Sequence, residues 1–235
     1  MQDIAMIPPV IQDNLDYLLW GNLSGGEPGG LLLTALLSLA AALLASLLGL
    51  ALGVAQLLGA SWLRRGLMAA TAVLRAIPVL MLIFWCYFLL PLLFGIDIPG
   101  LATVILALAL IHSAYLGQAV LAGLTAVGRG QWHAGLALGF TRWQTLRWLI
   151  LPQALRIMLP SFVNQWVSLL KDSSLAYIVG VAEFTFVATQ VNNREQVYPL
   201  EIFSAIAVGY LLLCGLLQLL GHWGARRWRQ PLSQP

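Results

Sequence analysis

Charge is scarce in this sequence. Asp, Glu, Lys and Arg make up 9% of the 235 residues, against about 25% in water-soluble domains. Hydrophobic residues make up 60% of the chain, and the mean hydropathy is +0.86. The two cysteines, Cys86 and Cys214, lie within apolar stretches and form neither a disulfide framework nor a metal-binding spacing. This composition excludes a soluble domain and predicts an integral membrane protein.

Lysine is almost absent as well. Lys171 is the single lysine, and Asp172 follows it inside an apolar segment. A phosphate-binding P-loop needs a glycine-rich loop that ends in Lys-Ser or Lys-Thr, so this chain offers no such ATP site. An intramembrane hydrolase is also disfavoured, because GxSxG and HExxH are missing and the neighbours His112 and Ser113 point about 100° apart on a helix. We therefore expect no catalytic residue, metal site or bound cofactor in this chain.

Long apolar runs are what the sequence has instead. Five segments reach the roughly 20 residues that cross a bilayer: 29–59, 66–93, 99–126, 159–188 and 199–223. The expected fold class is an all-α integral membrane protein with five transmembrane helices. Residues 29–225 form its membrane domain, after an extracytoplasmic segment (1–28) and before a cytoplasmic tail (226–235). In the first span, small residues recur at every fourth position and favour close helix packing: Ala41, Ala45, Gly49 and Gly53.

The distribution of charge predicts the orientation. Nine basic residues fall in the first loop, the third loop and the tail: Arg64, Arg65, Arg129, Arg142, Arg147, Arg156, Arg226, Arg227 and Arg229. Most acidic residues fall on the opposite side: Asp3, Asp13, Asp16, Glu27, Asp97 and Glu195. The positive-inside rule then places the N-terminus outside and the C-terminus in the cytoplasm. The sequence pI of about 9.1 reflects these arginines, so we expect no nucleic-acid partner.

The third loop, residues 127–156, has a helical pattern of its own. A short helix is expected over 132–138, ending at Gly139. Thr141, followed three residues later by Gln144, is typical of a capping box that starts a second helix.

This second helix is expected over 142–150, with Pro152 as its stop because the residue before a proline disfavours the helical conformation. Two short helices joined by a glycine turn predict a compact knob on the cytoplasmic face. The alternative is an interfacial amphipathic hairpin, with Trp143 and Trp148 among the lipid headgroups.

Within this loop, the segment HAGLALGFTRWQTLRWLILP resembles the cytoplasmic EAA loop of ABC importer permeases. That loop reads EAA, three residues, Gly, nine residues, Ile, one residue, Leu-Pro. The resemblance implies a coupling helix that inserts into a cleft of a separate ATP-hydrolysing subunit. The candidate coupling residues are His133, Ala134, Gly135, Gly139, Thr141, Leu151 and Pro152.

The chain departs from the family pattern at several positions. His133 replaces the usual Glu, which leaves no carboxylate for a charge-based docking contact, and Gly135 replaces the second Ala. A glycine there lowers helix propensity by about 1 kcal/mol relative to alanine. Gln118 and Leu121 stand where the family commonly has Glu and Arg. These joint losses predict one half of an unequal permease pair, a heterodimer, with a homodimer as the alternative.

The resemblance extends from about residue 29 to 227 and is greatest to permeases of the polar amino acid uptake branch. The pieces LRAIP, HSAYLGQAVLAG and LKDSSLAYIVGVAEF carry it, and TQVNNREQVYPLEIF leans toward glutamate/aspartate members. It implies a bacterial inner-membrane importer with ATPase subunits that bind ATP and Mg, a second permease subunit and a periplasmic or lipid-anchored binding protein. The partners then also include membrane lipid. The alternative is a self-standing secondary amino acid carrier or channel.

Charged residues inside the spans are candidates for the substrate path. Arg75 can hold the α-carboxylate of an amino acid through its planar guanidinium, or can bond backbone carbonyls as a structural residue. Pro78, which ends LRAIP, is placed on the same path. Lys171 and Asp172 cannot pair on a regular helix, so either each has its own partner or the helix breaks there. In a broken helix, Ser173 and Ser174 are candidate caps of a restarted half-helix, and Asp172 is a candidate acceptor for a substrate ammonium. The alternative is that Lys171 and Asp172 hold two spans or subunits together.

A polar stripe follows one side of the third span. His112, Tyr115 and Gln118 lie within an arc of about 120° on a helix. These side chains either line the substrate path or bond to neighbouring helices, as polar groups in membranes do.

Overall fold

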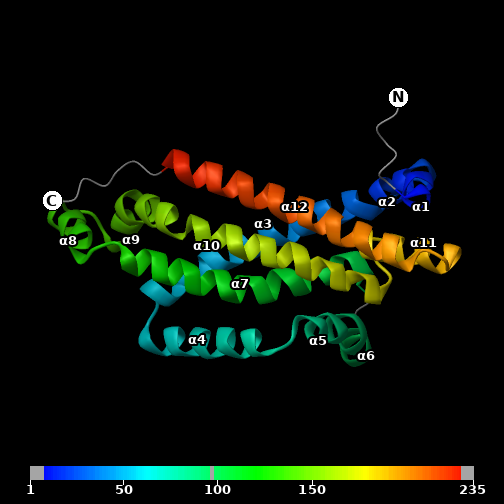
Figure 1. The fold of residues 1–235 in the computed structure, drawn as a ribbon. Helices are drawn as coiled ribbons and strands as arrows, with labels where there is room; N and C mark the ends of the chain where they lie inside the picture. Colours follow the sequence, from blue (N-terminus) through cyan, green and yellow to red (C-terminus); the bar gives the residue numbers. More distant parts are fainter. Residues whose placement is uncertain (1–7, 96–97, 229–235) are drawn as a thin grey trace. The chain divides into compact units, whose positions relative to one another are not determined.

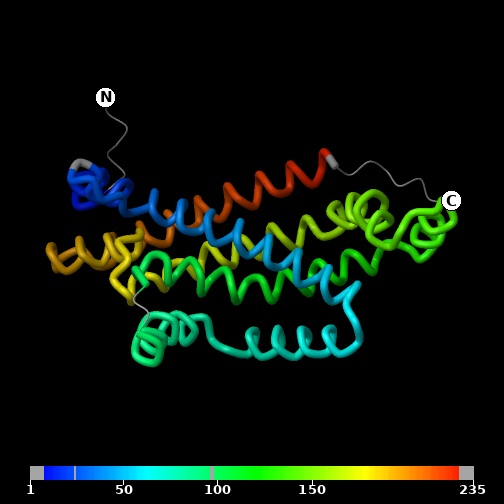
Figure 2. Tube along the Cα trace, turned by 180° about the vertical axis from the view of Figure 1, so that it is seen from behind, coloured from blue at the N-terminus to red at the C-terminus, as the bar shows by residue number. Residues whose placement is uncertain are grey.

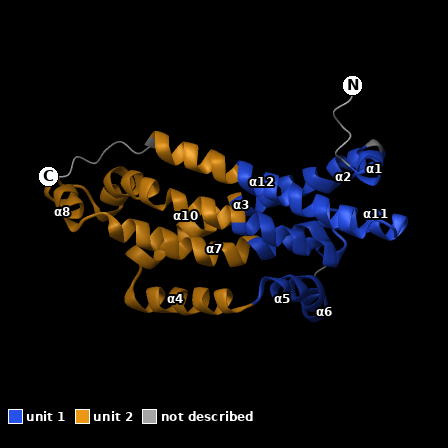
Figure 3. Cartoon of the chain, in the orientation of Figure 1, with its two compact units in different colours: residues 1–42, 78–108, 168–216 blue, residues 43–77, 109–167, 217–235 orange. Residues whose placement is uncertain are grey.

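The structure is a computed structural model that describes residues 8–95 and 98–228, without the side chains of Ser24 and Trp228. Three of the charged residues on which the predicted orientation rests lie outside this range: Asp3, Asp97 and Arg229. The chain is almost entirely helical (Figure 1) and divides into two compact units (Figure 3). Unit 1 comprises Met1–Ala42, Pro78–Leu108 and Ser168–Leu216, and unit 2 comprises Leu43–Ile77, Ala109–Val167 and Leu217–Pro235.

Long apolar helices confirm the membrane class. Within the described residues, three helices are long and apolar enough to cross a bilayer: α3 (Gly30–Leu58), α7 (Gly100–Ala126) and α12 (Pro199–Trp228). They fall where the first, third and fifth spans were expected.

The other two expected spans are interrupted. Residues 66–93 divide between α4 (Ser61–Ala76) and a helical segment that begins at Val79, and the pair counts as one further span only when its halves are taken together. Residues 159–188 contain the end of α10 (Leu151–Asp172), the 3₁₀-helix η4 (Ser173–Val179) and the start of α11 (Phe184–Glu195). A total of five spans stays a prediction.

Unit 1 holds the N-terminal elements. Helices α1 (Pro9–Asp13) and α2 (Leu15–Trp20) precede a two-stranded hairpin, β1 (Gly21–Asn22) and β2 (Glu27–Pro28), around the 3₁₀-helix η1 (Leu23–Gly25). After Pro78 come α5 (Val79–Phe84), the π-helix η2 (Trp85–Leu89) and α6 (Leu90–Phe94). Its apolar core joins α1, α2, α11 and α12 through Val10, Leu18, Phe184, Val187, Ala188, Val191 and Ile202.

Unit 2 is held by close packing of long helices. The small residues expected in the first span serve this purpose: a Cβ added to Gly49 would lie 2.6 Å from Cβ of Leu116, and one added to Gly53 would clash with Val120. The C-terminal half of α7 also runs beside α10 (Figure 2), since a Cβ added to Gly123 would lie 3.1 Å from Cβ of Met158. Glycine at these positions lets the helix backbones approach each other closely.

Candidate functional site

Residues 127–156 form a knob of short helices, as the sequence predicts. Helix α8 (Arg129–Ala137) ends two residues before Gly139, which has φ +82° and turns the chain away from the helix. The amide of Gly139 donates to the carbonyl of Leu136 at 3.0 Å, and that of Phe140 donates to the carbonyl of Gly135 at 3.1 Å. This pair of bonds is a Schellman motif, which requires the left-handed backbone that glycine adopts most readily. The expected break at Gly139 is confirmed.

The capping box is confirmed as well. Helix α9 (Arg142–Thr145) begins after Thr141, whose hydroxyl accepts from the amide of Gln144 at 3.2 Å. In return, the side-chain oxygen of Gln144 accepts from the amide of Thr141 at 2.8 Å. These two bonds satisfy amides that the first turn of a helix leaves free.

The expected stop at Pro152 is wrong. Helix α9 passes into the π-helix η3 (Leu146–Ile150), and α10 follows directly from Leu151. Pro152 therefore lies inside a continuous helical path, directly after the wider turn of the π-helix, and the helix runs through it. The helical path runs from Arg142 through Pro152 to Asp172, and so joins the knob directly to a long helix.

Gly135 has a structural reason inside the knob. A Cβ at this position would lie 2.5 Å from Cγ2 and 2.7 Å from Oγ1 of Thr145, whose hydroxyl also donates to the carbonyl of Thr141 at 3.0 Å. Both Gly135 and Thr145 are buried. The lower helix propensity of glycine is thus offset by the close contact that it permits between α8 and α9.

The candidate coupling residues divide into a group packed inside the knob and a group exposed on its surface. Gly135 is buried and Leu151 is half-buried, and Leu151 packs with Trp132 against the cluster formed by Val120, Leu124, Val127, Leu146, Ile150, Ala154 and Met158. The remaining candidates are exposed: His133, Ala134, Gly139, Thr141 and Pro152. Large apolar side chains outside the set of candidate coupling residues share this exposure: Leu136, Leu138, Phe140 and Trp143. We call these last four residues the apolar face of the knob.

Arg75 and Tyr115 come together in unit 2. The hydroxyl of Tyr115 donates to the backbone carbonyl of Arg75 at 3.3 Å, and the guanidinium carbon lies 5.9 Å from the centroid of the tyrosine ring. Nε of Arg75 donates to the carbonyl of Thr71 at 3.2 Å. Arg75 thus bonds to a backbone carbonyl, the arrangement of the structural interpretation, and its Nε is engaged within α4.

The polar stripe of α7 contacts a different helix at each residue. Nε2 of Gln165 on α10 donates to Nδ1 of His112 at 2.6 Å, Tyr115 reaches Arg75 on α4, and Nε2 of Gln118 donates to Gln56 on α3 at 3.4 Å. His112 is 1% exposed. These contacts are bonds between helices, the arrangement that the second interpretation expects.

The remaining candidates for the substrate path belong to unit 1: Pro78, Lys171, Asp172 and Ser173. Pro78 directly precedes α5, and the other three lie where α10 meets η4. Helix α10 ends at Asp172, where the chain passes directly into η4, and it leaves the helical conformation at Gly180, which has φ +77°. The expected capping role of the serines is wrong. The hydroxyl of Ser173 donates to the carbonyl of Leu170 at 2.7 Å, and that of Ser174 donates to the carbonyl of Lys171 at 2.8 Å. The serines therefore satisfy carbonyls at the end of α10, because the chain continues in the tighter turns of η4.

Glu183 caps the start of α11 instead, a role that no sequence pattern indicated. Its buried carboxylate accepts from the amides of Thr185 and Phe186, both at 2.9 Å, and from the hydroxyl of Tyr210 on α12 at 2.8 Å. Thr34 on α3 lies 3.4 Å from the same carboxylate. Glutamate is not among the preferred helix caps, so local rules did not find it. An acid that directly precedes a helix after an apolar break was the available signal.

Comparison with known proteins gives this arrangement a family. Residues 45–230 match the binding-protein-dependent transport system inner membrane component family. The glutamine transport system permease protein GlnP of Escherichia coli (strain K12) is 34% identical over 176 residues, which are 73% of this chain and 78% of that protein. The glutamate/aspartate import permease protein GltK of Escherichia coli O6:H1 is 32% identical over 177 residues, 71% of this chain and 77% of that protein.

Solved structures agree with these matches. The crystal structure of an amino acid ABC transporter with histidines has 28% identity and a TM-score of 0.75, and the match covers 83% of this chain and 91% of that one. The MetNI methionine ABC transporter shares the fold at 19% identity and a TM-score of 0.77, over 95% of this chain and 100% of that one. The alternative of a self-standing carrier finds no support here. The chain belongs to the binding-protein-dependent transport system inner membrane component family, as an ABC importer permease of the polar amino acid branch.

Proposed function

We propose that this permease takes up polar amino acids, leaning toward glutamate and aspartate, and that ATP hydrolysis on separate subunits drives its alternating access through the knob at residues 127–156. ATP and Mg are then bound by the ATPase subunits. The N-terminus faces outward, where a periplasmic or lipid-anchored binding protein delivers substrate, and the C-terminus faces the cytoplasm.

The exposed apolar face of the knob is the observation that carries this proposal. Leu138 is 71% exposed and Trp143 is 55% exposed. Both stand on short helices that are fixed by a Schellman motif, a capping box and a buried cluster. A rigid apolar surface is typical of a docking site, because a few large side chains supply most of the binding free energy at an interface. A continuous helical path to Asp172 offers a route by which movement of the knob reaches the spans.

The substrate class is supported by the relatives, which are named as glutamine, cystine and glutamate/aspartate permeases. Arg75 and Lys171 outnumber Asp172 among the candidate path residues, which favours an anionic substrate. The substitutions at His133, Gln118 and Leu121 support pairing with a second, different permease subunit.

The coupling role is tested by ATP hydrolysis in proteoliposomes that contain the permease, its ATPase and its binding protein. Leu138→Glu places a charge on the apolar face at a side chain that is 71% exposed. We expect stimulation by substrate-loaded binding protein to fall at least about tenfold, the effect of losing 1.4 kcal/mol of docking free energy. The matched control is Leu200→Glu, because Leu200 is 76% exposed but lies outside the knob. Equal losses in both variants would contradict the proposal.

The substrate is tested in the same proteoliposomes with a panel of amino acids. Glutamate and aspartate are expected to stimulate turnover most, and the absence of stimulation by any amino acid would overturn the proposed function. Arg75→Lys separates the two interpretations of Arg75. Full substrate-stimulated turnover in this variant would exclude a bidentate contact between Arg75 and the substrate carboxylate, because lysine cannot make one.

A further inference from the structure

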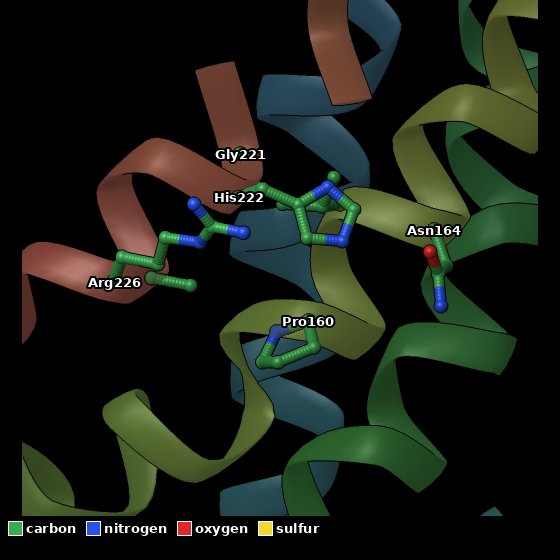
Figure 4. Close-up of a pocket in the computed structure, with 7 residues that line it drawn as sticks. Pro160, Asn164, Gly221, His222 and Arg226 are labelled. Atoms are coloured by element: carbon green, nitrogen blue, oxygen red, sulfur yellow. The ribbon is translucent and has the colours of Figure 1, made fainter. Parts of the chain in front are cut away.

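A preformed pocket lies between α10 and α12 in unit 2. It has a volume of about 280 Å³, and its residues come from both helices (Figure 4): Pro160, Val163 and Asn164 from α10, and Gly221, His222 and Arg226 from α12. The two helices approach closely beside it, since a Cβ on Gly221 would lie 2.5 Å from both methyl groups of Val163.

A second hollow continues from this pocket along α12. It is lined by Leu219, Leu220, His222, Trp223 and Arg226, so His222 and Arg226 belong to both hollows. Leu219 is 69% exposed and Trp223 is 58% exposed. We call the first hollow the polar pocket because it carries the polar groups of Asn164, His222 and Arg226 on otherwise apolar walls. The second hollow is a largely apolar extension of it.

The polar groups have defined donor and acceptor roles. Nδ1 of His222 lies 2.8 Å from the carbonyl oxygen of Gln218. A carbonyl only accepts, so Nδ1 carries the proton and Nε2 of the neutral ring is an acceptor. Arg226 supplies a cation and only donates. Among the described residues that line the two hollows there is no carboxylate to neutralise that cation.

The surroundings are those of a membrane surface. The most apolar window of α12 is 6% buried within the chain, so this helix leaves most of its surface for lipid or a partner. Near its end, the guanidinium carbon of Arg227 lies 4.1 Å from the ring centroid of Trp223. Tryptophan and arginine at the end of an apolar span are typical of the level of the headgroups.

We propose that these two hollows bind an anionic phospholipid with a hydroxylated headgroup, of the phosphatidylglycerol type. The lipid phosphate accepts from Arg226, a headgroup hydroxyl donates to Nε2 of His222, and Asn164 completes the polar wall. One acyl chain lies along Leu219, Leu220 and Trp223. Charge complementarity favours this occupant, because a cation between helices at the membrane surface suits a lipid phosphate. The site is independent of the transported substrate.

The test measures lipid affinity of the full chain in its purified complex, by native mass spectrometry with phosphatidylglycerol and, in parallel, phosphatidylcholine. Phosphatidylglycerol is expected to bind at least tenfold more tightly. Arg226→Gln and His222→Leu should each lower that preference at least threefold, with the thermal unfolding midpoint measured without added lipid as the check on folding.

Arg227→Gln is the matched control, since it removes the same charge from the neighbouring position without lining the polar pocket. An equal loss in Arg226→Gln and Arg227→Gln would overturn the proposal in favour of diffuse attraction. Equal binding of glycerol phosphate and intact lipid would overturn the role of the acyl chain. If phosphatidylglycerol failed to bind the complex and His222 were instead cross-linked to a second subunit, the site would be a protein interface and the proposal would be wrong.

Discussion

Helices α7 and α12 are nearly equal in hydropathy and opposite in environment. Their most apolar windows have mean hydropathies of 1.9 and 2.1, yet 61% of the window in α7 is buried within the chain and 6% of that in α12. Hydropathy identifies both as membrane helices. It does not tell which one lies inside the protein.

Side-chain size and polarity explain the difference. Buried positions of α7 include the small residues Ala107, Ala109, Ala114 and Gly117, and the polar His112. The surface of α12 is lined with leucines: Leu211, Leu212, Leu216, Leu219 and Leu220 are all more than half exposed. Without a hydrophobic driving force between helices in lipid, small residues and hydrogen bonds hold helices together. An apolar helix rich in both therefore belongs to the interior.

The largest expected effect comes from filling the contact face of α7. In Gly49→Leu the new side chain begins 2.6 Å from Cβ of Leu116 and 3.2 Å from the backbone nitrogen of Gly117, so α3 and α7 must separate. We expect a loss of about 3 kcal/mol of unfolding free energy or more, measured as a lower thermal midpoint in detergent. Gly215→Leu on α12 is the control, because no heavy atom lies within 4 Å of its added Cβ. A similar loss in both variants would contradict the claim that α7 is closely packed while this part of α12 is not.

Two histidines also distinguish the buried helix α7 from the exposed helix α12. His112 on α7 is 1% exposed and accepts from Gln165, whereas His222 on α12 is exposed. His112→Ala leaves a cavity and an unpaired amide, so we expect a loss of about 2–3 kcal/mol. His222→Ala should change stability by about 0.5 kcal/mol or less. Denaturant titrations of the two variants measure both values, and a reversed order would contradict the assignment of interior and surface.

The smallest effect tests the one polar anchor described for α12. In Tyr210→Phe, the carboxylate of Glu183 loses a donor at 2.8 Å, and a bond to a charged group is worth about 1.5–3 kcal/mol. Tyr115→Phe on α7 removes a bond of 3.3 Å from a side chain that is 40% exposed, so we expect about 0.5 kcal/mol. Thermal midpoints under identical conditions compare the two. A larger drop of the thermal midpoint in Tyr115→Phe than in Tyr210→Phe would contradict the expected order of these two hydrogen bonds.

Local patterns in the sequence predicted local structure well. Thr141 and Gln144 form the expected capping box, and Gly139 ends α8, because caps depend on residues three to five positions apart. The stripe of Gly49 and Gly53 packs against α7 for a similar reason: its spacing follows the helix period.

What the sequence did not reveal depends on contacts between distant residues. The π-helix Leu146–Ile150 carries the chain past Pro152, and no local signal distinguishes that course from a helix end. The partners of His112 and Gln118 lie on other helices, so a polar stripe alone cannot decide between a path and a set of bonds. Glu183 acquires its role from Tyr210 and Thr34, 27 and 149 positions away in the chain.

Because Gly135 and Thr145 are in contact, position 135 of the family motif has to be considered together with position 145. Restoring alanine at position 135 would bring it nearer to the motif letter by letter, yet its methyl carbon would lie 2.5 Å from Cγ2 of Thr145. The two positions therefore act as a matched pair, in which a smaller residue on α8 accompanies a branched one on α9. We expect such permeases to exchange both residues together, so that a departure from the motif marks co-adaptation within the knob and not the decay of its function.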